Sequence, residues 1–294
     1  FMGLVGSEMC IRDRLFTFGC SFTGYNWGTW ANVLAKELEP IEFYNFGRAG
    51  AGNHYIFNSL MQADAMYNFT HEDLVMVQWT NVSREDRYTD EWLTPGNIYS
   101  QTTYDLEFVR KYFTEYGASL RDYAFIKAAH EMLKHKTQWH FLQMLDITAF
   151  KDQWDLETKK EDIELNKLHA LYHETLENLI PSFYDVLYSN QLKKKFKQDS
   201  KLINRYFKDG HPNPFEHYAY LKEVFKHDWK DTTDAAVSEA FDKWKKLLQD
   251  AARPYEIRQE FFNVYKMNER WMKMFFYETK IVAPSQPDNR LTLV

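Results

Sequence analysis

Five residues in this chain mark a candidate site for acyl transfer. Ser21 offers a hydroxyl, His211 an imidazole and Asp209 a carboxylate, the groups with which a base deprotonates a nucleophile while an acid orients the base. Such chemistry also needs hydrogen-bond donors for the oxyanion. Gly50, in a glycine-rich loop, and Asn81 each follow a predicted strand, where they can converge with Ser21.

Short runs with the pattern of strands precede three of these residues and predict how they come together. Ser21 follows the apolar run 15–18, Gly50 follows the strand candidate 42–45 and Asn81 follows the apolar run 73–78. Helix-like patterns separate these runs, and a fourth run covers 138–145. Alternation of this kind predicts parallel strands whose carboxyl ends meet at one edge of a sheet. We therefore expect an α/β fold, a three-layer α/β/α sandwich with a mostly parallel five-stranded, flavodoxin-like sheet.

The intervening segments predict further helices and one long loop. Residues 82–103 are polar, contain Pro95 and Gly96, and are expected to form a surface loop of the kind that often serves as a lid or binding wall. The patterns after this loop predict helices over 104–116 and 120–135, broken at Gly117. Further helices are predicted over 30–38, 56–66 and 215–225.

The remaining stretches define the expected organisation of the chain. We expect a hydrolase domain over 15–226, interrupted by a polar helical insertion at about 152–207, and a helical extension over 227–294 packed on the same domain. The apolar stripe expected in that extension comprises Ala235, Ala240, Trp244, Leu247 and Leu248, before a break at Pro254. Residues 1–14 look like a translated sequencing-adaptor read-through, so we expect a non-native leader; a native N-terminal arm is the alternative.

Four of these segments resemble the sequence blocks of the SGNH (GDSL-like) hydrolase superfamily, and the resemblance spans roughly 15–225. Phe18-Gly19-Cys20-Ser21 resembles the first block and Asn45-Phe46-Gly47-Arg48-Ala49-Gly50 the second. Trp79-Thr80-Asn81 resembles the third, and Asp209-Gly210-His211-Pro212-Asn213 resembles the last.

The resemblance implies a role for each of the five residues. Ser21 would be the nucleophile, His211 its general base, and Asp209 the acid that orients the imidazole. The backbone N–H groups of Ser21 and Gly50, with the Asn81 side chain, would form the oxyanion hole. The implied activity is ester hydrolysis through an acyl-enzyme, most plausibly of a small O-acetyl-type ester. Because aromatic residues make up 17% of the chain, a carbohydrate-linked ester is slightly favoured.

The blocks depart from the family pattern at three places. Cys20 stands where the family usually has Asp, and Val82 follows Asn81 where a second Asp is usual. Asp209 and His211 are one residue closer than the usual Asp-x-x-His spacing, with Lys208 at the usual position of the acid. A catalytically inactive binding protein with this fold therefore stays open, as does an interaction protein assembled through its C-terminal helices.

Other polar residues have weaker claims to function. Arg84 and Trp79 could contact the substrate, although a surface salt-bridge cluster is the favoured role for Arg84. His217 competes with His211 as the base, but its place in a helix suits a packing or solvated role. His169 and His173 lie one helical turn apart without the His-Glu-x-x-His signature, so a solvated helix face is favoured over a metal site.

Composition limits the partners that we expect. The formal net charge of −6 argues against nucleic-acid binding, and the basic cluster 193–197 is expected to be a solvated helix face. With two cysteines, Cys10 and Cys20, neither a disulfide framework nor a cysteine zinc site is expected. No apolar run is long enough for a membrane span. We expect no cofactor and no metal, a small-molecule or glycan ester as substrate, and a cytoplasmic location; the oligomeric state stays open.

Overall fold

A computed structural model of the chain describes residues 14–25, 27–100, 103–148, 159–188, 211–250 and 280–281. Four of its strands coincide with the four runs of the sequence that predict strands. The strands are β1 (Arg14–Gly19), β2 (Glu42–Gly47), β3 (Leu74–Trp79), β4 (Arg87–Tyr88), β5 (Trp92–Leu93), β6 (Gln138–Gln143) and β7 (Lys280–Ile281). The helices are α1 (Trp30–Leu38), α2 (Asn53–Tyr67), α3 (Leu106–Tyr112), α4 (Glu115–Leu133), α5 (Lys159–Leu171), α6 (His173–Leu176), α7 (Phe183–Tyr188), α10 (Pro214–Val224) and α11 (Asp231–Asp250), with a 3-10 turn η1 (Ile98–Ser100).

The central sheet is parallel throughout its described part. Its strand order is β6-β3-β1-β2-β7, and each neighbouring pair is parallel. If β1, β2, β3 and β6 are numbered 1 to 4 along the chain, their order across the sheet is 2-1-3-4, which is the order of a flavodoxin-like sheet. The fifth strand, β7, lies beyond β2 and not beyond β6. The predicted α/β class, the three layers and the five-stranded sheet are thus confirmed, and only the edge of the fifth strand differs from the flavodoxin order.

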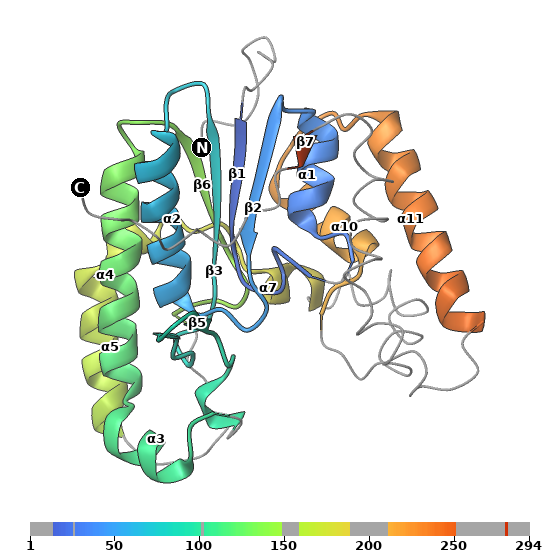
Figure 1. Cartoon of the computed structure of the whole chain (residues 1–294). Coiled ribbons are helices and arrows are strands. Elements are labelled where there is room, and N and C mark those ends of the chain that lie inside the picture. Colours follow the sequence, from blue (N-terminus) through green and yellow to red (C-terminus); the bar gives the residue numbers. More distant parts are fainter. Residues whose placement is uncertain are drawn as a thin grey trace.

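Helices cover both faces of this sheet (Figure 1). One layer contains α2, α4 and α5, and the other contains α1, α10 and α11. Because both faces are covered, the central strands are buried on both sides and have continuous apolar sequences. Residues 15–19 of β1 and all of β3 are buried. Rings also stack across the β1–β2 pair, at 4.8 Å between Phe16 and Tyr44 and 4.9 Å between Phe18 and Phe46.

The predicted helix break at Gly117 is wrong. The chain breaks between α3 and α4 at Phe113 and Thr114, and Gly117 lies in the first turn of α4. The Thr114 side chain caps this helix by accepting a hydrogen bond from Gly117 N–H at 3.1 Å. A threonine whose side chain accepts a hydrogen bond from a free N–H in the first turn favours the start of a helix. At this place, that effect outweighs the tendency of the nearby glycine to end a helix.

The predicted loop 82–103 contains some regular structure. Strands β4 and β5 form an antiparallel hairpin within it, and η1 follows. The loop then returns to its own start, since Arg84 and Asn97 form an isolated bridge. It is therefore a folded projection at the carboxyl edge of the sheet (Figure 1).

The C-terminal helix α11 packs against α1 and α10. Among its described side chains, the buried ones are Thr233, Val237 and Phe241, which recur every four residues. Ala235, which we predicted to lie in the apolar stripe, is exposed. Phe241 contacts Phe215 of α10, with ring centroids 5.6 Å apart. The side chains of the other predicted stripe residues lie outside the described part of the structure, and so does Pro254, the predicted helix break.

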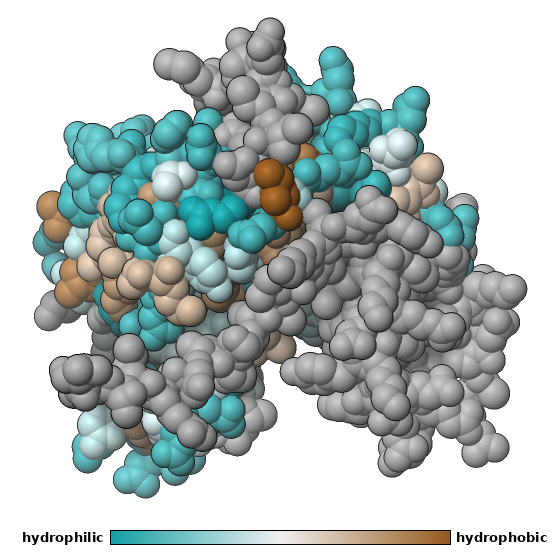
Figure 2. Space-filling model, turned by 45° about the horizontal axis from the view of Figure 1, so that its top comes forward, coloured by the Kyte–Doolittle hydropathy of each residue, from teal (hydrophilic) through white to brown (hydrophobic). Residues whose placement is uncertain are grey.

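Hydrophilic residues dominate the coloured surface in Figure 2, with brown atoms in small groups among them. Scattered exposed apolar residues, such as Ile41 and Met66, are ordinary on a folded domain. Among the helices of the described part, none is both long enough and apolar enough to cross a membrane.

Candidate active site

The turn after β1, residues 20–24, presents Ser21 at the carboxyl edge of the sheet; we call it the Ser21 turn. Its backbone closes through hydrogen bonds from the N–H groups of Thr23 and Gly24 to Cys20 O, at 2.9 and 3.1 Å. A Cβ at Gly19 would lie 2.0 Å from Thr23 Oγ1. Glycine at position 19 therefore allows the strand to end in so tight a turn.

The Ser21 turn is also attached to the end of β2. Asn45 Nδ2 donates to Thr23 O at 2.9 Å. The backbones of Gly24 and Gly47 are in direct contact, since a Cβ at Gly47 would lie 2.3 Å from Gly24 N. The two strand ends thus form one unit with little freedom of relative movement.

His211 lies against Ser21, although 190 positions separate them in the sequence. His211 Nε2 is 2.7 Å from Ser21 Oγ. The imidazole is stacked on the Tyr25 ring, with centroids 4.1 Å apart and planes 14° apart. Trp27 Nε1 donates to Pro212 O at 2.7 Å, which ties the segment after His211 to the segment after the Ser21 turn. The structure brings these two sequence-predicted residues together within hydrogen-bonding distance.

A capping box starts α10 two residues after His211. Asn213 Oδ1 accepts from Glu216 N–H at 2.9 Å, and Glu216 Oε2 accepts from Asn213 N–H at 2.8 Å. Pro214 occupies the first turn of the helix, where its missing N–H is not needed. Burial raises the pKa of Glu216 to about 7. Reciprocal capping fixes the start of α10, and with it the chain on which His211 lies.

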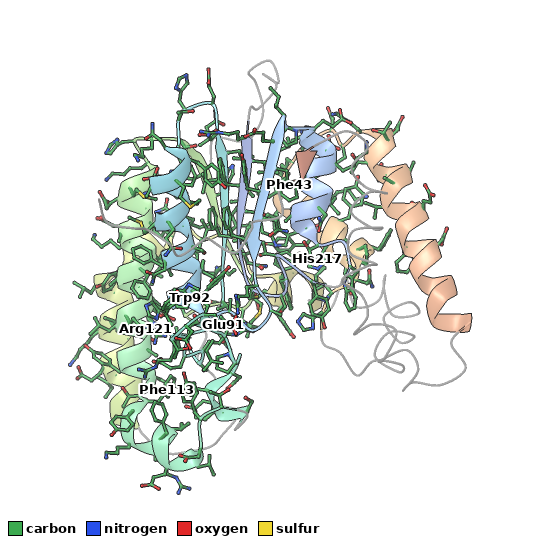
Figure 3. All side chains as sticks on the ribbon, in the orientation of Figure 1. Phe43, Glu91, Trp92, Phe113, Arg121 and His217 are labelled. Carbon is green, nitrogen blue, oxygen red and sulfur yellow. The ribbon has the colours of Figure 1, made fainter. Side chains whose placement is uncertain are left out.

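His217, the competing base, is a buried packing residue (Figure 3). Its ring lies edge-on to Phe22 and Phe183, at centroid distances of 6.1 and 5.5 Å. Burial, together with the neighbouring His211, lowers the pKa of His217 to about 3. The imidazole is therefore neutral at pH 7, and the solvated role considered for it does not apply.

Two parts of the last sequence block lie outside the described residues. Asp209, the predicted acid, is one of them, and Gly210 is the other. The role of Asp209 therefore stays a prediction from the sequence.

Three N–H donors lie at neighbouring strand ends. Among the described residues, no acceptor contacts Ser21 N–H, Gly50 N–H or Asn81 Nδ2. The loop that carries Gly50, residues 48–52, follows β2, and Asn81 follows β3. Gly50 has φ +76°, in the left-handed region that favours glycine. A Cβ there would lie 2.1 Å from Thr94 O, so the loop 82–103 packs directly on Gly50.

The sulfur of Met144 contacts both the Ser21 turn and the segment that follows β3. Cys20 Sγ lies 3.6 Å from Met144 Sδ, Thr80 Oγ1 lies 3.6 Å from it and Arg84 Nη2 lies 3.4 Å from it. Cys20 is fully buried, and its thiol packs on this thioether. A polarizable sulfur suits such a junction because it accepts weak hydrogen bonds from several directions.

Of the two predicted substrate contacts, Arg84 is half-buried against the Gly50 loop and Trp79 lies in the core. Arg84 Nη1 donates to Ala51 O at 2.7 Å, so its guanidinium connects the start of the loop 82–103 to the Gly50 loop. Trp79 is fully buried, with its ring edge-on to Phe141 at 5.6 Å. A side chain with no exposed surface cannot contact a substrate in this conformation, which corrects the prediction for Trp79. The expected salt-bridge cluster forms around Glu85, which pairs with Arg121 and Arg87, and among the described residues Arg84 makes no ion pair in it.

His169 and His173 lie on two different helices, because the chain turns at Tyr172 between α5 and α6. The His169 ring packs near Tyr123, at 5.6 Å between centroids, and His173 Nε2 lies 3.1 Å from Glu177 Oε1. Only His173 thus has the solvated character that we expected for both. Within the described part of the chain, no group of three or more His, Cys, Asp and Glu side chains has the geometry of a metal site.

Sequence reasoning missed several residues that hold this edge together. They are Tyr25, Trp27, Met144, Asn53 and Asp122. Asn53 directly follows the glycine-rich loop, which is a usable signal, because an asparagine at a helix start often hydrogen-bonds to backbone. Nothing in the local pattern marks Met144 or Asp122, since each functions through contacts with residues far away in the sequence.

The solved structures that are similar to this chain include two of low sequence identity. No protein-family model matches the chain, and no curated protein matches it. A crystal structure of a member of the lipolytic protein G-D-S-L family from Veillonella parvula has 16% identity and a TM-score of 0.39, covering 73% of this chain and 99% of that one. A GDSL-like lipase from Bacteroides thetaiotaomicron has 15% identity and a TM-score of 0.37, covering 78% of this chain and 89% of that one. Since both TM-scores are below 0.5, neither likeness supports a conclusion about this chain.

Proposed function

We propose that this chain is a serine hydrolase that cleaves carboxylic esters through an acyl-enzyme. The observation that carries the proposal is the 2.7 Å contact between Ser21 Oγ and His211 Nε2. This distance suits direct proton transfer from a nucleophile to its base. Both groups lie at the carboxyl edge of a parallel sheet, where ligands bind in folds of this kind.

In the proposed mechanism, Ser21 Oγ bonds to the ester carbonyl carbon as His211 Nε2 takes its proton. The tetrahedral intermediate then expels the alcohol oxygen, which receives that proton from His211 and leaves an acyl-enzyme. Water, deprotonated by the same imidazole, then attacks the acyl carbon. The second tetrahedral intermediate breaks its bond to Ser21 Oγ, which takes the proton back from His211 as the acid leaves. Asp209 would orient the imidazole and stabilise its cation, as the sequence resemblance implies.

The Ser21 and Gly50 N–H groups and Asn81 Nδ2 would stabilise the oxyanion. Each of these donors has no acceptor among the described residues, so each can donate to an incoming oxygen at no cost in protein hydrogen bonds. Removal of one such donor typically lowers kcat by about a hundredfold or more.

We further propose that the acyl group is small, of the O-acetyl type, and that the alcohol part is a carbohydrate. The backbone of Thr94 and Gly96 packs against Gly50, which favours a short acyl chain beside that donor. Tyr184, 36% exposed, stacks on Phe22 of the Ser21 turn. An aromatic ring in that position suits the apolar face of a sugar.

The test is hydrolysis of nitrophenyl acetate, butyrate and octanoate, with labelling by a fluorophosphonate probe, in the parent, Ser21→Ala and His211→Ala proteins. We expect labelling at Ser21 alone, preference for acetate, and loss of turnover in both variants. His227→Ala is the matched control, because it also removes an imidazole but not one at the candidate site. His227 Nε2 lies 3.0 Å from Glu37 Oε1, near the C-terminal end of α1. A parent protein that neither labels nor hydrolyses any of the esters would favour the inactive binding protein instead.

A further inference from the structure

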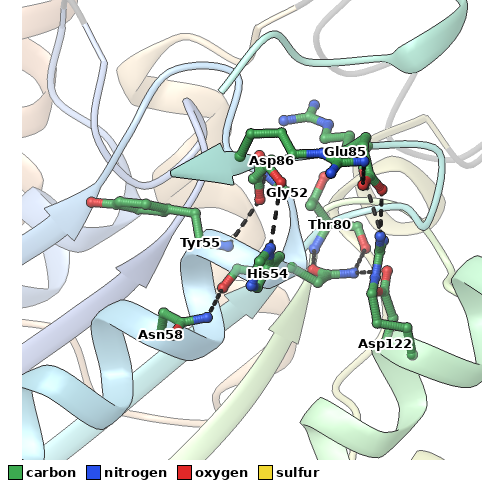
Figure 4. Close-up of polar contacts among 12 residues, drawn as sticks. Gly52, His54, Tyr55, Asn58, Thr80, Glu85, Asp86 and Asp122 are labelled. Atoms are coloured by element: carbon green, nitrogen blue, oxygen red, sulfur yellow. Dashed lines mark hydrogen bonds and ion pairs between the residues drawn. The ribbon is translucent and has the colours of Figure 1, made fainter. Parts of the chain in front are cut away.

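A buried polar network lies behind the candidate oxyanion hole, between α2, α4 and the end of β3 (Figure 4). Its centre is Asn53, the first residue of α2, which has no exposed surface. Asn53 Oδ1 accepts from Thr80 N–H at 2.8 Å, and Asn53 Nδ2 donates to Thr80 O at 2.9 Å. One side chain thus satisfies both backbone polar groups of a single residue.

Thr80 immediately precedes Asn81. Its N–H belongs to the peptide plane on one side of its Cα, and its C=O belongs to the plane that it shares with Asn81. A pair of hydrogen bonds to both groups therefore fixes the backbone orientation from which the Asn81 side chain projects. Because buried hydrogen bonds of this kind exclude alternative backbone positions, Asn53 limits where Asn81 Nδ2 can lie.

Asp122 of α4 holds Asn53 in turn. Its carboxylate is fully buried, and Asp122 Oδ2 accepts from Asn53 Nδ2 at 2.7 Å. Its other oxygen accepts from Arg121 Nε, also at 2.7 Å. This bond requires the same amide orientation as the two bonds to Thr80, because the reverse orientation would place Asn53 Oδ1 against Thr80 O and against the carboxylate. Asp122 therefore adds a third contact that holds the Asn53 side chain in place.

The same network extends to the other side of Asn81. Arg121 Nη2 donates to Arg84 O at 3.1 Å, and Arg121 Nη1 donates to Glu85 Oε2 at 2.6 Å. The segment with Asn81 is therefore held both before it, at Thr80, and after it, at Arg84 and Glu85.

The Gly50 loop is connected to this network as well. Gly52 N–H donates to both oxygens of the Asp86 carboxylate, at 2.8 and 2.9 Å, and Tyr55 N–H donates to Asp86 Oδ2 at 2.9 Å. Asn53 follows Gly52 directly, so the loop that carries Gly50 and the segment that carries Asn81 meet at one helix start. An oxyanion hole needs its donors at fixed relative positions, and this helix start connects two of them.

We propose that Asn53, held by Asp122, is a positioning residue that fixes the oxyanion donors Asn81 and Gly50 relative to one another. The inference rests on the proposed esterase function. It predicts an effect on kcat more than on KM, because correct donor placement matters most for the charge that develops in the transition state. A misplacement of about 1 Å in such a site can cost about a hundredfold in rate.

The experiment compares Asn53→Ala, Asn53→Asp and Asp122→Asn with the parent. Asn58→Ala is the matched control, because Asn58 also lies on α2 but donates only within that helix, to His54 O at 2.9 Å. Two measurements are made on each protein: kcat and KM for a nitrophenyl acetate, and hydrogen exchange at the Thr80 amide, which does not require turnover.

For Asn53→Ala we expect a fall in kcat of about 10- to 100-fold with KM changed less than about threefold, and faster exchange at Thr80. Asn53→Asp should be at least as impaired, since it keeps the acceptor for Thr80 N–H but places a second carboxyl against Asp122. Asp122→Asn should give a smaller loss, because an amide oxygen can still accept from Asn53. Asn58→Ala should match the parent in both measurements.

Unchanged exchange at Thr80 in Asn53→Ala, or an equal fall in kcat in Asn58→Ala, would overturn the inference. So would a rise in KM without a change in kcat, which indicates loss of substrate contact instead of donor placement. A Ser21-dependent hydrolase that is indifferent to Asn53→Ala would overturn this inference alone. A parent protein without Ser21-dependent hydrolysis would overturn the proposed function and, with it, the catalytic role of Asn53.

Discussion

Replacement of Gly50 by alanine gives a prediction whose size follows from the structure. Gly50 has φ +76°, and left-handed backbone costs an L-residue about 1–2 kcal/mol. In addition, the new Cβ would lie 2.1 Å from Thr94 O, whereas ordinary contacts start at 3.4 Å. One of the two backbones must therefore move by about 1.3 Å, and a shift of about 1 Å at a catalytic donor can cost about a hundredfold in kcat.

Gly96 supplies a matched control for this substitution. It has φ +83°, so alanine there has the same backbone cost, but its Cβ would approach only Gly50 Cα, at 3.9 Å. We expect Gly96→Ala to lower the free energy of unfolding by about 1–2 kcal/mol with kcat nearly unchanged. Gly50→Ala should lower the free energy of unfolding further and reduce kcat by about a hundredfold.

The assay is urea unfolding of the parent and both variants, with kcat and KM for a nitrophenyl acetate. If Gly50→Ala unfolds cooperatively and keeps the parent kcat, Gly50 N–H is not an oxyanion donor. If Gly96→Ala loses as much kcat as Gly50→Ala, the loss comes from backbone strain in the hairpin region and not from displacement of the donor.

Three further substitutions test other parts of the structure. Because the pKa of His217 falls from its ordinary value near 6.5 to about 3 on folding, only the unfolded chain takes up this proton as the pH falls through that window. The free energy of unfolding of the parent should then drop by about 1.4 kcal/mol for each unit by which the pH falls. Urea unfolding from pH 7 to 4 should show a smaller drop in this free energy for His217→Phe than for the parent. An equal dependence on pH in the two proteins would contradict this. Trp27→Phe removes the hydrogen bond to Pro212 O, so we expect kcat to fall about tenfold through a looser His211, and an unchanged kcat would show that other contacts hold the imidazole. Thr114→Ala removes the α4 cap and should lower the free energy of unfolding by about 1 kcal/mol without affecting kcat, so a loss below about 0.3 kcal/mol would show that water replaces the cap.

The sheet could be predicted from the sequence because its central strands are buried on both faces. A short, continuous apolar run such as that of β3 is typical of a strand in a covered parallel sheet, and the four main strands lie where such runs predict them. Strand β7 could not be predicted, because a two-residue edge strand such as Lys280–Ile281 has no periodic pattern. The boundary between α3 and α4 was mispredicted because Thr114 as a cap outweighs Gly117 as a breaker.

The placement of Ser21 and His211 beside one another agrees with the sequence-based expectation, since both come from blocks with a recognisable order along the chain. The surrounding network could not be predicted in the same way. The hydrogen bond between Asn53 and Asp122 joins residues 69 positions apart, and no local pattern distinguishes this pair from other polar residues on helices. The buried position of Trp79 follows from its place as the last residue of a fully buried strand, which a motif comparison does not take into account.

The contact between Gly24 and Gly47 has a consequence for how the protein can change over time. A Cβ at position 24 would lie 2.5 Å from Gly47 O, and a Cβ at position 47 would lie 2.3 Å from Gly24 N. Because each residue would collide with the backbone of the other, no compensating side-chain substitution at one position can accommodate a larger residue at the other. In a saturation library we expect both positions to accept glycine only, whereas Gly117, whose nearest neighbour is the Thr114 side chain at 2.9 Å, should tolerate small residues. Sequence change in this protein is therefore restricted at the junction of β1 and β2, where two backbones are in direct contact.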